Sequence, residues 1–269
     1  MKSMTFRKIV VDTILAIVSS ICLAYGEPLF NWVLKTTYST NNVKVYQKIG
    51  SDTYVQVVDM GAGAKIEFKQ TYVKMMSHYG RNLKAYKRDF VSTWYANAGN
   101  PVSVINGDYF FNSSEYQVTT PLSFGVRSNG SLVDLGSDPI NDKQVEFFPG
   151  QGASVTISNQ SRISGGTAQN IIGGYSPLRA ISKGLTIGRT GICTLSPTFP
   201  SRLVLIITAT AATQSTVDAD FINWKCIFGS QIMMDGSASS QLSMKNGFNL
   251  RGLGGSPRTV PQVIVVRNN

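Results

Sequence analysis

Four short segments carry the side chains with which this chain could do chemistry: residues 105–110, 172–178, 235–240 and 258–261. Each is a polar turn beside an apolar run, and most of them contain glycine. Folds place reactive and ligand-binding groups on such loops, at the ends of buried strands that hold them still. The carboxylates, guanidinium groups, amides and hydroxyls gathered there favour an enzyme over a bland globular domain.

Several common catalytic sets do not fit the composition. His78 is the only histidine and lies far from any nucleophile-like turn, which argues against Ser-His-Asp or Cys-His hydrolysis and against a cysteine–histidine zinc site. Cys22 falls in the N-terminal segment, which leaves Cys193 and Cys226. These two are either a disulfide or a pair of small buried apolar side chains.

The elements that position the turns are mostly short strands. Residues 102–105 form an apolar strand that runs directly into the first turn, after a helix predicted over residues 88–98. Residues 54–60 and 65–68 alternate like the two strands of a hairpin or loose meander. The Asn-Gly pair at 129–130, between two apolar runs, predicts another hairpin.

A strand–helix–strand crossover leads to the third turn. Residues 203–209 are the most apolar strand, Thr216 is the expected cap of a helix over residues 217–228, and residues 231–234 form the second strand. Ligands favour the carboxyl ends of strands in such units, where Asp235 lies. We expect an α+β protein, a single domain with a central mixed β-sheet and flanking helices.

The N-terminus resembles an export signal. Positive charges at Lys2, Arg7 and Lys8 precede an apolar stretch over residues 13–25, and small residues follow at a suitable cleavage position. A buried helix is the alternative. The expected organisation is a signal peptide or membrane anchor at 1–26, a lead-in or linker at 27–50 and the domain at 51–269. Secretion, or extracytoplasmic display through that anchor at the membrane, follows from this interpretation.

The charge of the chain indicates the kind of partner. A net charge of +10 and a pI near 9.6 suit an anionic ligand. The basic residues are scattered, their densest group is residues 84–88, and no nucleic-acid-binding signature is present, so nucleic acid is not an expected partner. An anionic small substrate or an anionic cell-surface polymer accounts for the charge equally well.

The order of the turns resembles the phosphodiester glycosidase family. That family has an Asn-Gly-Gly-Phe-Phe run, a Gly-Gly-x-Pro-Leu element, an Arg-Thr-Ala segment, a Leu-Asp-Gly-Gly-Gly-Ser-Ser turn and an Arg-Pro-x-Pro strand start. In the same order, within residues 54–266, this chain has Asn106-Gly107-Asp108-Tyr109-Phe110, Gly173-Gly174-Tyr175-Ser176-Pro177-Leu178, Arg189-Thr190-Gly191, Met234-Asp235-Gly236-Ser237-Ala238-Ser239-Ser240 and Arg258-Thr259-Val260-Pro261.

The resemblance implies hydrolysis of a glycosyl phosphodiester, a sugar-1-phosphate ester of N-acetylglucosamine type, in an extracytoplasmic glycan. Such cleavage needs a carboxylate near the anomeric carbon, for which Asp235 is the first choice. Asp108 is either a second catalytic carboxylate or a calcium ligand. Arg189 and Arg258 would hold phosphate oxygens. The other substrate-binding candidates are Asn106, Gly107, Gly173, Gly174, Gly236, Ser239 and Ser240.

Four positions depart from the family pattern and keep other interpretations open. Met233 stands where asparagine usually precedes the Leu-Asp-Gly turn, Ser237 and Ala238 replace glycines, and Asp108 replaces a glycine. A catalytically impaired module that binds an anionic glycan is the main alternative. A structural envelope protein that associates through its basic surface is another. Residue by residue, Asp235 could be a plain turn and Asn106 a partner for buried backbone groups.

Overall fold

The computed structural model describes residues 31–78, 80–138, 142–157, 159–180, 182–195, 200–253 and 258–268. The predicted signal or anchor at 1–26, with Cys22, lies outside these residues. Within them, no helix combines the length and apolar character that a membrane span needs.

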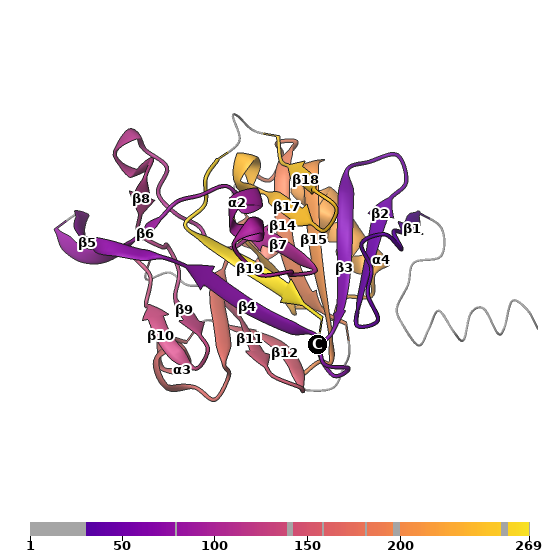
Figure 1. Ribbon diagram of the computed structural model, residues 1–269, viewed down its shortest axis with the longest axis horizontal. Helices are drawn as coiled ribbons and strands as arrows, with labels where there is room; N and C mark the ends of the chain where they lie inside the picture. The colour runs from indigo at the N-terminus through magenta and orange to yellow at the C-terminus, as the bar shows by residue number, and fades with distance from the viewer. Residues whose placement is uncertain are drawn as a thin grey trace, which may run out of the picture.

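Antiparallel strands dominate the described chain (Figure 1). Sheet 1 contains, in spatial order, β1 (Trp32–Leu34), β2 (Val43–Lys48), β3 (Thr53–Asp59), β15 (Leu203–Ala212), β14 (Ile187–Thr194) and β16 (Gln231–Met233). Sheet 2 contains β10 (Ser131–Asp134), β9 (Val126–Ser128), β13 (Asn170–Gly174), β11 (Lys143–Phe148) and β12 (Gly152–Ile157). Sheet 3 contains β18 (Phe248–Arg251), β17 (Gln241–Met244), β7 (Ser103–Asn106), β19 (Gln262–Arg267) and β4 (Lys65–Gln70).

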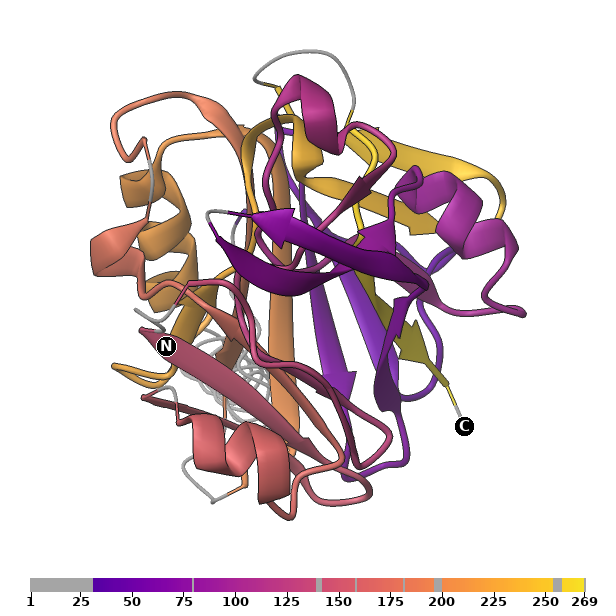
Figure 2. The same ribbon diagram turned by 90° about the vertical axis from the view of Figure 1, so that its left-hand side faces the viewer.

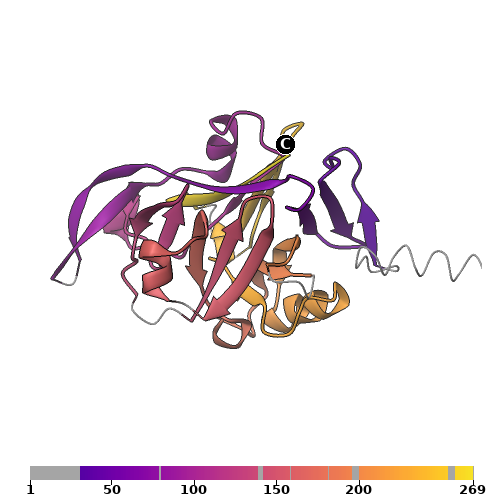
Figure 3. The ribbon, with the colours of Figure 1, turned by 90° about the horizontal axis from the view of Figure 1, so that it is seen from below.

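A fourth, three-stranded sheet forms an arm on the body. It contains β5 (Tyr72–His78), β6 (Arg81–Lys87) and β8 (Thr119–Thr120). Two perpendicular views show the β5 end of this arm extending away from the body, on the side opposite β1 and β2 (Figures 1 and 3). His78 is the last residue of β5, beside the turn to β6; it is buried, and its Nδ1 lies 2.5 Å from the Tyr116 hydroxyl, which fits a structural role.

One apolar core fills the space between sheets 1, 2 and 3. Ile206 of sheet 1, Phe147 of sheet 2 and Ile264 of sheet 3 are all buried in it. Because successive strand residues face opposite sides, Leu205 points to a second apolar cluster beneath the helix α4 (Gln214–Asn223). Burial on both faces explains why β15 is the most apolar strand of the sequence.

The helices lie on the outside of the sheets (Figure 2). Helix α2 (Val91–Ala96) packs on β7 and β17, α3 (Gln160–Gly165) contacts β9 and β10, and α4 covers β14 and β15. The Thr213 side chain, rather than Thr216, caps α4 by accepting a hydrogen bond from the Thr216 N–H. The helix therefore begins three residues earlier than expected.

The sheet arrangement corrects the predicted central mixed sheet. Strands β15 and β16 run in the same direction, as the crossover predicted, but β14 lies between them and pairs antiparallel with both. The hairpin predicted over residues 54–68 is also wrong, because β3 pairs with β2 and β15 whereas β4 pairs with β19. The 129–130 hairpin is confirmed: β9 pairs with β10, and Asn129 and Gly130 have positive φ of 49° and 76°.

Two further features bear on the organisation of the chain. Part of the expected lead-in at 27–50 forms β1 and β2, at the edge of sheet 1. Cys193 of β14 and Cys226, in the turn after α4, form a disulfide with their Cα atoms 5.9 Å apart. Disulfides persist in oxidising compartments, so this bond fits an extracytoplasmic location.

Candidate active site

The four turns identified in the sequence meet at one end of the sheets. The Asp235 N–H donates to the Gly107 carbonyl at 3.3 Å, which joins the third turn to the first. Tyr175 of the second turn forms an isolated bridge with the end of β16. The Arg258 N–H donates to the Ala238 carbonyl at 3.4 Å, which adds the fourth turn. Asp235 therefore lies where four distant segments come together.

Asn106 fixes the backbone of the Asp235 turn. It is fully buried, and its Nδ2 donates to the Asp235 carbonyl at 2.7 Å. Its Oδ1 accepts from the Thr190 hydroxyl at 2.8 Å and from the Gln241 N–H at 3.1 Å. The buried Ser240 hydroxyl lies 3.2 Å from that of Thr190 and belongs to the same network. These contacts fit a supporting role for Asn106 and Ser240 better than direct contact with a ligand.

Only one oxygen of the Asp235 carboxyl group accepts a well-formed hydrogen bond. Oδ1 accepts from the Gly236 N–H at 2.9 Å. Oδ2 and the Ser239 hydroxyl are buried; the hydroxyl is close enough to act on the carboxyl group, but neither atom makes a hydrogen bond of standard geometry with the described residues. Burial raises the pKa of Asp235 to about 6, against the opposing effects of Ser239, Gly236 and the charges of Arg258 and Arg88. A carboxyl group with this pKa and a spare oxygen is suited to act as a base or nucleophile.

Arg88, which the sequence did not single out, is the first of two cations beside Asp235. Its Nε and Nη2 donate to the Thr259 carbonyl at 3.0 and 2.8 Å, and its Nη1 donates to the Tyr116 carbonyl at 2.7 Å. The guanidinium also lies 4.6 Å from the centre of the Phe110 ring. Burial lowers the pKa of Arg88 to about 10, so the group stays charged at neutral pH. It anchors the fourth turn and adds a positive charge there.

Arg258 is the second cation, and its guanidinium is the more available one. The residue is half-buried and its charge acts on both Asp235 and Arg88. Its guanidinium has no hydrogen-bond partner within the described part of the chain, whereas Arg88 is bound to carbonyl groups. Two cations beside one buried carboxylate leave an excess of positive charge. The arrangement can bind an anion, and guanidinium groups bind phosphate bidentately.

Asp108 lies close enough to Asp235 for their charges to interact. Both its oxygens accept from the Phe124 N–H, at 3.3 and 3.1 Å, and the side chain is buried. Burial raises the pKa of Asp108 well above its ordinary value, and the charge of Asp235 adds to this effect. Burial thus shifts Asp108 toward its protonated form, whereas Asp235, with a pKa of about 6, is mostly ionised at neutral pH. Pairs of carboxyl groups whose environments push their pKa values apart are typical of sites that carry out acid–base chemistry.

Aromatic rings form one wall beside the two carboxyl groups. The Tyr109 ring packs edge-on against Tyr175 and Phe124, with centroids 4.9 and 5.5 Å apart. Burial raises the pKa of Tyr109 well above its usual value, and the charge of Asp235 is the next cause. The Tyr109 hydroxyl is thus a neutral group in the same electrostatic environment. Around Asp108, the described residues contain no group of three or more side chains able to hold a metal ion.

Arg189 has a different environment from Arg258. Its guanidinium donates to the carbonyls of Ala212, Ser182 and Leu185, at 3.4, 2.5 and 3.3 Å. Burial lowers the pKa of Arg189, and Tyr109 opposes that effect, which places its charge near the site. These contacts fix the 182–185 loop against β15. They favour a positioning role for Arg189 over direct phosphate contact.

Gly173 and Gly174 permit close packing behind the site. A Cβ on Gly173 would lie 2.6 Å from the Phe124 Cβ, and one on Gly174 would lie 2.5 Å from the Met233 carbonyl oxygen. The Gly173 N–H already donates to the Gly125 carbonyl at 3.0 Å, so it is not a spare donor for an anion. Glycine is needed here because a side chain would push the second turn away from β16.

The departures at 237 and 238 place a serine and an alanine in the turn that follows Asp235. Ser237 has a positive φ of 59°, a conformation that glycine adopts more easily. Its carbonyl oxygen is enclosed by Gly188 and Gly252, where a Cβ would lie 2.1 and 2.3 Å away. Ala238 is fully buried. The chain thus keeps a glycine-like backbone at 237 with serine in place.

Comparisons with known proteins support the fold. No protein-family model and no curated protein sequence matches the chain. The catalytic domain of zebrafish N-acetylglucosamine-1-phosphodiester α-N-acetylglucosaminidase, in a form auto-inhibited by its pro-peptide, is similar with a TM-score of 0.53 and 12% identity, over 89% of this chain and 83% of that one. The fold is thus similar to that of a phosphodiester glycosidase catalytic domain.

Two bacterial structures share the same architecture. A Burkholderia pseudomallei protein described as exported has a TM-score of 0.52 and 9% identity, over 84% of this chain and 74% of its own. A hypothetical protein from Synechocystis has a TM-score of 0.51 and 10% identity, over 87% of this chain and 63% of its own. At such identities the likeness concerns the fold alone.

Proposed function

We propose that the protein is a hydrolase that cleaves a glycosyl phosphodiester, a sugar-1-phosphate ester of N-acetylglucosamine type, in an extracytoplasmic glycan. One observation carries the proposal. The buried Asp235 carboxyl group, with a spare oxygen and a pKa of about 6, lies beside the cations Arg88 and Arg258. This combination occurs on a fold similar to that of a phosphodiester glycosidase catalytic domain.

The chemistry follows from the charges of these groups. The transition state for cleavage at an anomeric carbon resembles an oxocarbenium ion, which a carboxylate stabilises, attacks or supplies with an activated water. With a pKa of about 6, the Asp235 carboxyl group is mostly ionised at neutral pH. Phosphate leaves readily as an anion, so cations that hold its oxygens matter more than a strong general acid. Arg258 supplies an available guanidinium, and Arg88 adds its field.

The environment of Met233 gives no direct support to the binding-module alternative. Met233 is buried in the apolar cluster with Phe221 and Leu205, and its sulfur lies 3.5 Å from Gln214 Nε2. The replacement of the family's asparagine therefore occupies a core position beneath α4. The Asp235 carboxyl group keeps its hydrogen bond from the Gly236 N–H and its neighbouring cations.

Turnover of a chromogenic glycosyl phosphodiester tests the proposal. We expect the wild type to release the chromophore, and Asp235→Asn to lower kcat by at least about 100-fold, the scale of a lost acid–base group. Asp59→Asn, which removes a half-buried carboxylate at the end of β3, is the matched control and retains wild-type turnover. If the wild type shows no turnover and the substrate still raises its melting temperature, the binding-module alternative replaces the hydrolase.

A further inference from the structure

Tyr109 offers a hydroxyl group at the candidate site that the chemistry above does not use. The residue is half-buried, and its backbone is fixed because the Ser123 N–H donates to the Tyr109 carbonyl at 2.8 Å. The hydroxyl makes no hydrogen bond with the described residues, whereas the Tyr175 hydroxyl donates to Asp138 Oδ2 at 3.1 Å. A tyrosine hydroxyl can donate and accept, so this group is available to a ligand.

The neighbouring rings hold Tyr109 beside the Asp235 turn. Tyr109 packs edge-on against Phe124 and Tyr175, which also pack edge-on against each other with their centroids 4.9 Å apart. Tyr175 and Met233 exchange two backbone hydrogen bonds, of 3.2 and 2.7 Å, two residues before Asp235. Edge-on aromatic pairs are favourable beyond the area that they bury. The Tyr109 ring is therefore held in place as one wall of the site.

Tyr109 and the two arginines beside Asp235 belong to different parts of the site. Arg88 and Arg258 act on Asp235 with their charges, and both lie at the fourth turn. The cation that acts on Tyr109 is instead Arg189, whose guanidinium is bound to backbone carbonyl groups. These surroundings suit a neutral polar group of a ligand better than a phosphate.

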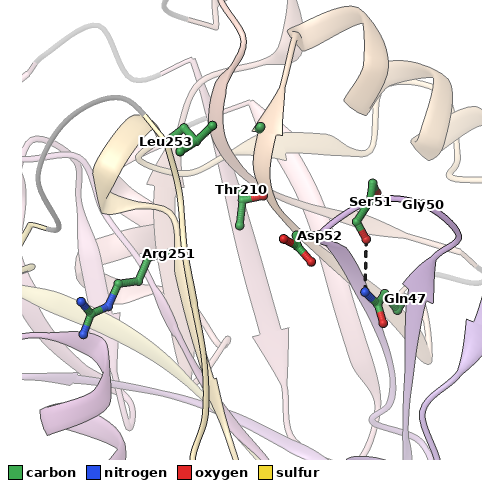
Figure 4. Close-up of a pocket in the computed structure, with 8 residues that line it drawn as sticks. Gln47, Gly50, Ser51, Asp52, Thr210, Arg251 and Leu253 are labelled. Carbon is green, nitrogen blue, oxygen red and sulfur yellow. Dashed lines mark hydrogen bonds between the residues drawn. The ribbon is translucent and has the colours of Figure 1, made fainter.

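A cleft beside the end of β18 also adjoins the Asp235 turn, but its lining has no part in the four turns. It is lined by Gln47, Gly50, Ser51, Asp52, Thr210, Ala211, Arg251 and Leu253. Asp52 and Thr210 face this cleft, and the Arg251 guanidinium points away from both of them (Figure 4). The Asp235 carboxyl group does not belong to this lining, so the cleft does not form the wall against which a reacting sugar would lie.

We infer that Tyr109 determines the specificity of the site for the sugar. A glycosyl phosphodiester carries its phosphate and its sugar ring on either side of the bond at the anomeric carbon. Arg258 holds the phosphate, and the rings of Tyr109 and Tyr175 form the wall for the sugar ring. The Tyr109 hydroxyl bonds a hydroxyl or acetamido group of that sugar. The inference rests on the proposed function, which places the anomeric carbon at Asp235.

The binding of two probes tests this assignment. Calorimetry measures the Kd of N-acetylglucosamine-1-phosphate, which carries a sugar and a phosphate, and the Kd of inorganic phosphate, which carries the anion alone. We expect Tyr109→Phe to weaken binding of the sugar phosphate about tenfold, the effect of one lost hydrogen bond, and to leave binding of phosphate unchanged. Arg258→Gln should weaken the binding of both. Tyr72→Phe, which removes the hydroxyl of an exposed tyrosine on the arm, is the matched control and changes neither.

Three results would overturn the inference. These are equal weakening of both probes by Tyr109→Phe, unchanged binding of the sugar phosphate by this variant, and a wild type that binds the sugar phosphate no more tightly than phosphate. Unchanged binding of phosphate by Tyr109→Phe also shows that the variant keeps its fold. The result does not depend on turnover. If the chromogenic ester is not cleaved and Tyr109→Phe still weakens binding of the sugar phosphate alone, the hydrolase fails and the role of Tyr109 in sugar recognition stands.

Discussion

Replacing Asp235 by asparagine should remove activity and stabilise the fold at neutral pH. The carboxyl group has a pKa of about 6 in the native state and an ordinary value of 3.8, because burial penalises its charge. The difference corresponds to about 3 kcal/mol of native-state stability. Asparagine carries no charge and keeps an oxygen for the Gly236 N–H.

The sign of the pH dependence follows from which state binds the proton. Below pH 3.8 both the folded and the unfolded chain hold the proton, and Asp235 makes no difference. Between pH 3.8 and 6 the unfolded chain releases it while the folded chain retains it, so the wild type loses stability as pH rises. Above pH 6 the group is ionised in both states, so the loss of stability that Asp235 causes no longer changes with pH. Relative to Asp235→Asn, the wild type should thus be about 3 kcal/mol less stable at pH 7–8 and only about 0.5 kcal/mol less stable near pH 4.

Thermal unfolding of both proteins from pH 4 to pH 8 measures this difference. The expected gain at pH 7–8 is about 6–12 °C in Tm, at about 2–4 °C per kcal/mol for a chain of this size. Asp142→Asn is a control of opposite sign. Burial of Asp142 is outweighed by hydrogen bonds from Ser176 and by the charge of Arg179, which lower its pKa, so its loss destabilises at neutral pH. A pH-independent difference, or a less stable Asp235→Asn at pH 8, would refute the account of the buried carboxylate.

Three further outcomes follow. Because Asp235 must be ionised to act, kcat/KM should rise with pH through about 6, and a pH–rate profile that is flat between pH 5 and 7 would contradict this role. Arg258→Ala should lower kcat/KM about 10–100-fold, the effect of a charge-assisted hydrogen bond to phosphate, while Arg202→Ala leaves it unchanged in the same kinetic assay. Cys226→Ser should cost about 3–4 kcal/mol in urea unfolding, from the 33-residue separation to Cys193, and an unchanged midpoint would show that the disulfide does not restrict the unfolded chain.

The sequence allowed us to predict that the turns meet. Each polar turn follows or precedes a buried strand, and the ends of neighbouring strands lie together at the edge of a sheet. The strand that ends at Asn106 and the one before Asp235 are examples. The sequence did not identify Arg88 as a residue of the site. It belongs to the site because Asp89 is bridged to Val260, a contact between residues far apart in the chain that leaves no local signal. The residue appeared only as part of a basic cluster.

The sheet partners were predicted least well, for a related reason. Alternation of apolar residues identified β3 and β4 as strands, and the glycine turn between them suggested that they pair. Each instead pairs with a strand more than a hundred residues away, β15 and β19 respectively. The period of a strand fixes which side chains face the core but does not identify its neighbour. For the same reason we expected one mixed sheet, whereas the structure has antiparallel sheets.

The most direct test of the central claim is a structure of the protein with a non-hydrolysable phosphonate analogue of an N-acetylglucosamine-1-phosphodiester. The account predicts that the anomeric carbon lies next to Asp235 Oδ2 and that the phosphonate oxygens are within hydrogen-bond distance, about 3 Å, of the Arg258 guanidinium. An analogue bound with its phosphonate remote from Arg258, or with its anomeric carbon beside another carboxyl group, would contradict it.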